Sequence, residues 1–179
     1  MAIVSDANIL SSLAAADALD LLPQVFVGDK IFIPQAVEQE LQAGLTYGKS
    51  HLNRVFQAIS LGKIQVLHLT AHERALTTPL PRKLHAGERE GIILCQVRKH
   101  IFLSNDKRAI GYCQANRISS VNLEAFLRLL WVRRILSQTE VKRLINTMQT
   151  VERLTLKKSQ LDNILAPRRP RRRRRRRKP

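Results

Sequence analysis

The stretch Ala2-Ile3-Val4-Ser5-Asp6-Ala7-Asn8 decides the fold, because a short apolar run ends there on a carboxylate and a carboxamide. A strand that is buried on both faces of a parallel sheet reads as a continuous apolar run. In open α/β sheets, ligands bind just beyond the carboxyl ends of the strands. The sequence therefore predicts that Asp6 lies at the sheet edge where chemistry takes place.

The rest of the chain repeats the alternation of strand and helix. Further strands are predicted at residues 30–33, 64–69, 101–103 and 118–121, with helical patterns between them. Each return to a parallel strand needs a crossover, which is usually a helix. The pattern predicts a three-layer α/β/α fold with a central, mainly parallel sheet of about four or five strands, plus C-terminal helices.

Local signals predict two helix boundaries. Apolar residues at helical spacing over residues 9–22 indicate one continuous helix that Pro23 ends. The sequence Ser159-Gln160-Leu161-Asp162 resembles a capping box, which predicts that Ser159 caps the last helix.

The length of 179 residues suits one domain with a sizeable core and is too short for two ordinary domains. A composition of 44% hydrophobic and 25% charged residues is typical of a globular protein, which excludes general disorder. We predict an α/β domain at residues 1–121 and a helical extension at residues 122–166 that packs on the same core. Residues 167–179 are predicted to form a disordered, Arg-rich tail.

The net charge of +17 is concentrated in this tail, and about +7 remains on the body of the chain. The tail would engage phosphates with little sequence information, and its affinity would fall steeply with salt. An acidic partner protein, a membrane surface and a merely solvated end are the alternatives. The ten predicted nucleic-acid-binding residues are Arg168, Arg169, Arg171, Arg172, Arg173, Arg174, Arg175, Arg176, Arg177 and Lys178.

The sequence lacks the patterns that would indicate a cysteine metal site, a nucleotide-binding loop, a secreted protein or a membrane protein. Cys95 and Cys113 lack metal-ligand spacing and are interpreted as reduced core thiols. The five histidines are scattered, and no Gly-rich phosphate-binding loop follows a strand. There is neither a secretory signal pattern nor a run of roughly 20 apolar residues. We therefore expect a cytoplasmic protein with no membrane segment.

Four acids from separate segments are the candidate catalytic and metal-binding residues. Asp106 ends the apolar run at 101–103, as Asp6 ends the first strand, while Glu40 and Glu88 lie near predicted helix starts. An acid directly after a buried strand faces a desolvation cost unless a cation or donor compensates it. Glutamates near helix starts can instead complement the helix dipole, and Glu38 and Glu90 are interpreted in that way.

Carboxylates in this arrangement suit one or two hard divalent cations, which prefer oxygen ligands. In a two-metal site, ions about 3.5–4 Å apart stabilise both the attacking and the leaving oxygen of a phosphoryl displacement. Metal-bound water then supplies the nucleophile, and no serine, cysteine or histidine is needed. One-metal and two-metal mechanisms both fit the sequence.

Four motifs in order resemble the PIN domain family, and within it the VapC-like toxin ribonucleases. The motifs are Val4-Ser5-Asp6-Ala7-Asn8, the run from Ile33 to Leu41, Gly87-Glu88-Arg89-Glu90-Gly91-Ile92, and Leu103-Ser104-Asn105-Asp106-Lys107. The Gly-Glu-x-Glu motif and the helices after residue 121 resemble a subgroup with a C-terminal helical extension. In the fourth motif, Asn105 stands where many relatives carry an additional acid.

The resemblance implies a Mg²⁺- or Mn²⁺-dependent endonuclease that usually acts on RNA, and an antitoxin protein that blocks its site. Asp6, Glu40, Glu88 and Asp106 would form the acidic quartet, with Asn8, Ser104 and Asn105 as supporting polar residues. A homodimer is compatible with this reading. The alternatives are a non-catalytic PIN-like protein that binds nucleic acid, and a DNA-directed defence or repair nuclease.

Overall fold

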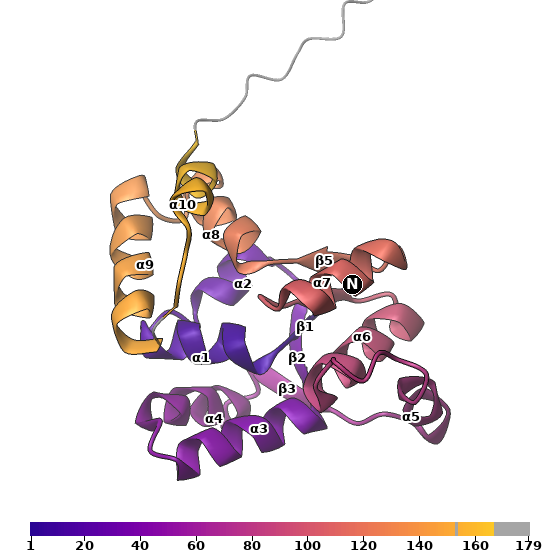
Figure 1. The fold of residues 1–179 in the computed structure, drawn as a ribbon. Helices are drawn as coiled ribbons and strands as arrows, with labels where there is room; N and C mark the ends of the chain where they lie inside the picture. Colours follow the sequence, from indigo (N-terminus) through magenta and orange to yellow (C-terminus); the bar gives the residue numbers. More distant parts are fainter. Residues whose placement is uncertain (153, 167–179) are drawn as a thin grey trace, which may run out of the picture.

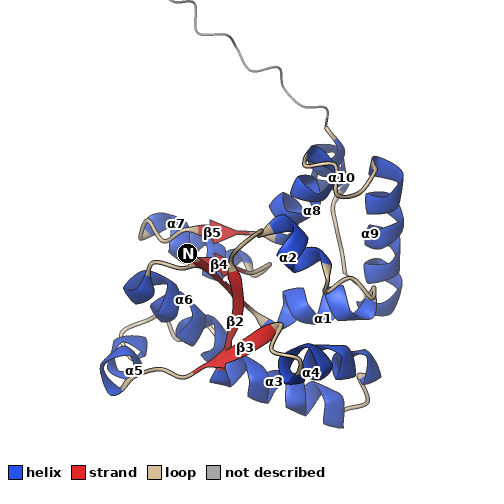
Figure 2. Cartoon of the chain, turned by 180° about the vertical axis from the view of Figure 1, so that it is seen from behind, coloured by secondary structure: helices blue, strands red, loops and turns tan. Residues whose placement is uncertain are grey.

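A single sheet of five parallel strands forms the centre of the molecule, which confirms the predicted α/β class (Figure 2). The computed structural model describes residues 1–152 and 154–166, so the predicted Arg-rich tail lies outside the described residues. The order of the strands across the sheet is β3-β2-β1-β4-β5. Their bounds are β1 Ala2–Ser5, β2 Lys30–Pro34, β3 Ile64–Leu67, β4 Ile101–Leu103 and β5 Ser120–Val121.

Helices connect the strands and continue beyond the last of them (Figure 1). No helix in the described part of the chain is long and apolar enough to cross a membrane. The helices are α1 Ala7–Ala15, α2 Leu21–Val25, α3 Gln35–Thr46, the 3-10 helix η1 Ser50–Leu52, α4 Asn53–Ser60, α5 Ala71–Thr77, α6 Ala86–Arg98, α7 Lys107–Ala115, α8 Leu123–Val132, α9 Gln138–Glu152 and α10 Lys158–Leu165.

The central strand β1 is buried on both faces, as its apolar run predicts. Successive side chains of a strand point to opposite faces of the sheet. Ile3 accordingly belongs to the hydrophobic cluster that includes α1, whereas Val4 belongs to the cluster that includes α6 and α7. Both side chains are fully buried. The sheet is thus covered by helices on both faces.

The chain adds strands first on one side of β1 and then on the other, which creates a topological switch point between β1 and β4. The chain runs outward from β1 through β2 to β3 and then returns, through α5 and α6, to β4 on the other side of β1. Ser5 of β1 is in register with Leu103 of β4. Ligands of doubly wound sheets bind in the crevice at such a point, outside the carboxyl ends of the strands.

In the C-terminal extension, α9 packs on α1 and α8 on α2, while α10 packs on α8. The rings of Phe26 and Phe126 stack at 6.1 Å between α2 and α8, and α9 contacts α1 near its lower end in the view of Figure 1. The guanidinium group of Arg128 in α8 donates hydrogen bonds to the carbonyl oxygens of Asn163 and Ala166. These bonds fix the C-terminal end of α10, because they satisfy carbonyls that a helix end leaves unpaired.

The prediction of one helix over residues 9–22 was wrong. Helix α1 ends at Ala15, Asp17 adopts a left-handed conformation with φ of 53°, and α2 then contains Pro23 instead of stopping before it. Proline is accepted there because the first turn of a helix does not use its backbone N–H groups in intrahelical bonds.

The predicted cap at Ser159 was also wrong. Helix α10 begins at Lys158, so the capping position falls on Lys157, two residues earlier. The backbone N–H of Lys157 donates to the Gln160 side chain at 3.0 Å. The Gln160 side chain thus provides the reciprocal bond of a capping box, but its partner is the backbone of Lys157 and not the predicted cap residue Ser159.

Gly91 in α6 has no room for a side chain, which gives a first test of the packing. A Cβ atom at this position would lie 2.5 Å from the ring of the buried Phe102. We expect Gly91→Ala to lower the free energy of unfolding by about 1–3 kcal/mol, the usual cost of overpacking. Urea unfolding followed by circular dichroism measures the change.

Gly111 in α7 provides the matched control, because a Cβ atom there would meet nothing within 4 Å. Gly111→Ala is expected to raise the free energy of unfolding by roughly 0.5–1 kcal/mol, since alanine loses less backbone entropy in a helix than glycine does. Equal effects of the two substitutions would contradict the close contact between α6 and β4.

Candidate active site

Asp6 is the buried centre of the site, with a side chain that is only 3% exposed. It caps α1, because its Oδ1 accepts a hydrogen bond from the N–H of Ile9 at 2.8 Å. Its Oδ2 accepts one from the Ser104 hydroxyl at 2.5 Å and one from the N–H of Asn105 at 3.3 Å. The carboxylate therefore joins the carboxyl end of β1 to the segment after β4.

Asp106 reaches the same sheet edge as the cap of α7. Its Oδ1 accepts hydrogen bonds from the N–H groups of Arg108 at 2.7 Å and Ala109 at 2.9 Å. Its own N–H donates to the Ser104 hydroxyl oxygen at 3.1 Å. Ser104 thus connects the two acids, since it donates to Asp6 and accepts from the backbone of Asp106.

Glu88 and Glu40 come from two helices that meet at their first turns. Glu88 is 7% exposed and accepts a hydrogen bond from the N–H of His85 at 2.9 Å. A Cβ atom at Gly87 would lie 2.7 Å from Val37 of α3 and 3.7 Å from Oε2 of Glu40. The absence of a side chain at Gly87 therefore lets α6 approach α3 and brings the two glutamates close together.

Three of the four predicted acids line one small cavity. This acid cavity, of about 30 Å³, is lined by Asp6, Glu40 and Glu88 together with Asn8 and His85 among others. Asp106 lies in the adjoining hollow, which also contains Asn8 and Asn105. The structure thus brings the predicted site residues of the body of the chain to one place, with Asp106 at its side.

The electrostatics of the site reflect crowded negative charge. Burial raises the pKa of the Asp6 carboxyl group to about 6, although hydrogen bonds lower it, and the charge of Glu88 raises it further. Burial also raises the pKa of Glu88, while the His85 N–H lowers it and the charges of Asp106 and Glu40 raise it. The cluster therefore disfavours full ionisation of its carboxyl groups.

The donor chemistry of the cluster fits a hard divalent cation. Across residues 1–152 and 154–166, no three His, Cys, Asp or Glu side chains already converge as a ready-made metal site. Three of the four acids use oxygen atoms to cap helices, whereas Glu40 is exposed and has no such bond. A cavity of about 30 Å³ lined by carboxylates has room for one ion, which Asp6, Glu40 and Glu88 would hold.

Glu90 was expected to complement the start of its own helix, α6, but the structure places it at the start of α3. Its Oε2 accepts a hydrogen bond from the N–H of Ala36 at 3.1 Å, so it serves the first turn of α3 and not its own helix. The sequence could not show this, because the bond depends on how α6 packs against α3.

Glu152 is an acid at the site that sequence reasoning missed. It ends α9 and lines the hollow that contains Asp106. Its carboxylate lies 2.7 Å from Nε2 of His51 and forms an ion pair with Nζ of Lys49 at 3.6 Å. No local pattern marks this residue, because only the packing of α9 on α1 brings it near β4.

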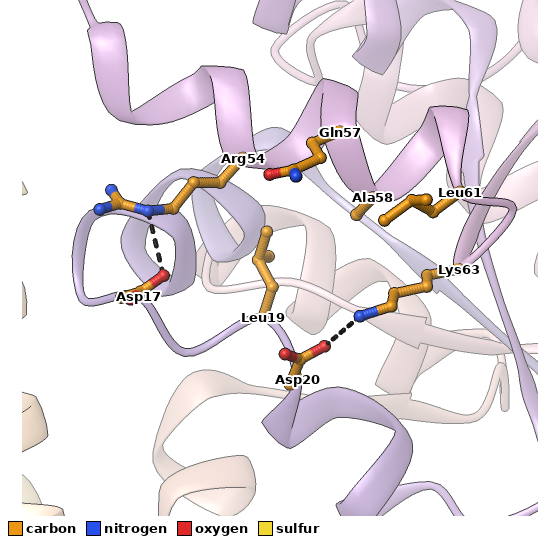
Figure 3. A pocket seen from close by; sticks show the side chains of 8 residues that line it. All are labelled: Asp17, Leu19, Asp20, Arg54, Gln57, Ala58, Leu61 and Lys63. Atoms are coloured by element: carbon orange, nitrogen blue, oxygen red, sulfur yellow. Dashed lines mark hydrogen bonds and ion pairs between the residues drawn. The ribbon is translucent and has the colours of Figure 1, made fainter.

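A second well-formed hollow lies elsewhere, as Figure 3 shows, and has a different character. Its cations are already neutralised, since Arg54 pairs with Asp17 at 3.0 Å and Lys63 pairs with Asp20 at 2.9 Å. Lys63 directly precedes β3, so this hollow is at the amino ends of the strands. It gathers no acidic cluster, and the switch point is the better candidate for the active site.

Comparison with protein families agrees with this geometry. The model of a family described as a PIN domain (DUF3368) matches residues 2–167. The chain belongs to the PIN domain family. PIN domains are typically nucleases and generally use divalent metals. The match includes the helices after residue 121, so the extension belongs to what this PIN domain family shares. No curated protein and no solved structure matched the chain.

The raised pKa of Asp6 in this PIN domain predicts a pH-dependent stability without metal. Because the folded state binds this proton more tightly than the unfolded chain, whose pKa is near 3.8, the free energy of unfolding falls as pH rises from about 4 to about 6. The fall amounts to roughly 3 kcal/mol. Asp6→Asn removes this component, and urea unfolding in EDTA at several pH values measures it.

Asp20→Asn is the control for this measurement, since Asp20 is largely exposed. The difference in unfolding free energy between Asp6→Asn and wild type should change more over this pH range than the difference between Asp20→Asn and wild type, because only Asp6 is buried. A pH dependence of Asp6→Asn no larger than that of Asp20→Asn would contradict the desolvation of Asp6.

Proposed function

We propose that this protein is a metal-dependent endoribonuclease that hydrolyses phosphodiester bonds. Its catalytic and metal-binding residues would be Asp6, Glu40, Glu88 and Asp106. The observation that carries the proposal is the acid cavity, where carboxylates from three separate elements meet at the switch point of the sheet. Such a cluster is costly without a cation, as the raised pKa values of Asp6 and Glu88 indicate. The family, whose members are typically nucleases, supports the same reaction class.

The residues of the chain would prepare this site in separate ways. Ser104 holds Oδ2 of Asp6 in place and links it to the start of α7. Asp106 uses Oδ1 as a helix cap, which leaves Oδ2 without a bond among the described residues. A bound Mg²⁺ or Mn²⁺ would neutralise the phosphate and lower the pKa of its attacking water. Substitution of a residue that, like Ser104, hydrogen-bonds to a metal ligand typically lowers metal affinity or activity about 10- to 100-fold.

We also propose that the enzyme is the toxin of a toxin-antitoxin pair, with an antitoxin protein that covers the acid cavity. This rests on the resemblance of the four motifs to VapC-like nucleases. A neighbouring gene for a small acidic protein with a DNA-binding motif would support the pair. RNA is the proposed substrate, and sequencing the ends of cleaved RNA would identify the preferred site.

Two glutamates of α3 provide a matched test of the proposed chemistry. Glu40 lines the acid cavity, whereas Glu38, two residues earlier on the same helix, does not. We expect Glu40→Gln and Asp6→Asn to lower the rate of Mg²⁺-dependent RNA cleavage at least about 100-fold, because each removes a proposed metal ligand. Glu38→Gln should retain the wild-type rate within about twofold.

Cleavage of a defined RNA oligonucleotide, resolved on denaturing gels, measures these rates. Circular dichroism confirms that each variant is folded. Wild-type activity in Asp6→Asn would reject the nuclease, because a contaminating enzyme would then account for the cleavage. Equal losses of cleavage rate in Glu38→Gln and Glu40→Gln would show that the acid cavity is not the catalytic site.

A non-catalytic nucleic-acid-binding protein is the second candidate, because three of the acids already serve as helix caps. Deletion of residues 168–179 separates the two functions. A nuclease should retain cleavage at low salt without the tail, whereas a pure tail-dependent binder should lose RNA binding in a filter assay. Complete loss of binding, with no cleavage by either protein, would favour the second candidate.

A further inference from the structure

Three adjoining hollows run from the acids to the C-terminal extension. The acid cavity shares Asn8 with a central hollow of about 200 Å³, which contains Asp106 and Glu152. The central hollow shares Asn105 with a third space of about 390 Å³, which we call the basic cleft. The three spaces are therefore neighbours along the carboxyl edge of the sheet.

The basic cleft differs from the acid cavity in its chemistry. Its lining combines Lys107 at the start of α7 with Lys157 at the start of α10, and it contains no acid. Both lysines are exposed, and neither has an ion-pair partner in the described ranges 1–152 and 154–166. The cleft thus offers two positive charges beside a cluster of negative ones.

Amide side chains supply most of the other polar groups of the cleft, whose lining also includes Thr155. Asn122 uses its oxygen to cap α8, where it accepts from Ala125 at 2.8 Å, and Gln160 uses its oxygen to accept from Lys157. These bonds hold both amides in place. The Gln160 NH₂ group also donates a hydrogen bond to Oε2 of Glu124 at 3.5 Å, and an NH₂ group has a second N–H for a further acceptor. Gln114 of α7 also lines the cleft.

The size of the acid cavity explains why a nuclease would need this cleft. About 30 Å³ holds a cation or a water molecule but not a nucleotide. An endonuclease must bind nucleotides on both sides of the bond that it cleaves. The basic cleft, within the usual size range of ligand pockets, adjoins the central hollow at Asn105, and that hollow adjoins the acid cavity at Asn8.

We propose that the basic cleft binds the single nucleic-acid strand next to the scissile phosphate. Lys107 and Lys157 would contact phosphates of the strand, and the amides of Asn122, Gln160 and Gln114 would contact base edges. Lysines position a nucleic acid through its phosphates, whereas side-chain amides can read unpaired bases. This inference rests on the proposed nuclease function and assigns the C-terminal extension one wall of the substrate path.

The wall that carries Lys157 is well supported by the extension. Leu156, directly before it, is buried in the same cluster as α1, and Ile164 of α10 is fully buried. Arg128 and Trp131 of α8 donate hydrogen bonds to the carbonyls at the end of α10. The cleft is therefore held between α7 and an anchored helix, as a binding surface requires.

The test compares Lys107→Ala/Lys157→Ala with Lys30→Ala/Lys63→Ala in the full chain. The control pair removes the same charge at the amino ends of β2 and β3, at the opposite edge of the sheet. Steady-state cleavage of a fluorescein-labelled single-stranded RNA gives kcat and KM, and a DNA strand of the same sequence forms the second arm. Circular dichroism confirms folding.

We expect KM to rise roughly 10- to 30-fold in the cleft variant at 0.1 M salt, with kcat within about twofold, because two phosphate contacts are lost. The salt dependence of log(1/KM) should become shallower by about 1.4, at about 0.7 per contact. The control variant should match wild type. Whichever strand shows the effect is the one that the cleft binds, and a KM equal to that of the control for both strands would overturn the proposal.

A second measurement does not depend on cleavage. Single-stranded RNA carrying 4-thiouridine is cross-linked to the wild-type chain in EDTA, and the attached peptides are identified by mass spectrometry. Cross-links should fall in residues 105–114 and 155–160. Their absence would overturn the cleft, whatever the activity of the enzyme. A wild-type chain that cross-links there but never cleaves would reject the nuclease and retain the cleft.

Discussion

The hydrogen bond from Ser104 to Asp6 is the interaction on which the arrangement of the site depends. It joins two strand ends that are distant in the sequence but adjacent in the sheet. A buried carboxylate is tolerated only if donors or a cation compensate for its lost hydration. Asp6 has three such donors, so the sheet can close around it while the negative charge stays at the switch point.

The same acids also stabilise the helices that surround the site, and this dual use is compatible with metal binding. The N-termini of α1, α6 and α7 carry partial positive charge and unpaired N–H groups, which favour a nearby carboxylate. A carboxylate has two oxygen atoms with several lone pairs, so it can cap a helix and still present a ligand. The helix ends thus hold the cluster in place before any cation arrives.

The sequence was most informative about site residues that directly follow a strand. The acids after β1 and β4 could be placed because an apolar run that ends on a polar residue is visible locally. Asp17 and Pro23 were not foreseen, because a single left-handed residue breaks the helix without changing its apolar spacing. Glu152 and the pairing of Lys107 with Lys157 could not be predicted, since they depend on how the extension folds back over α1 and α7.

The close contact at Gly87 has a consequence for the choice of ion. A Cβ atom at Gly87 would meet the Val37 side chain at 2.7 Å and lie 3.7 Å from Oε2 of Glu40, so this glycine lets the two walls that carry Glu40 and Glu88 approach each other. Mg²⁺ prefers oxygen ligands at about 2.0–2.1 Å, whereas Ca²⁺ prefers about 2.3–2.6 Å. A larger residue at position 87 would push these walls apart, which would disfavour the shorter ligand distances that Mg²⁺ prefers.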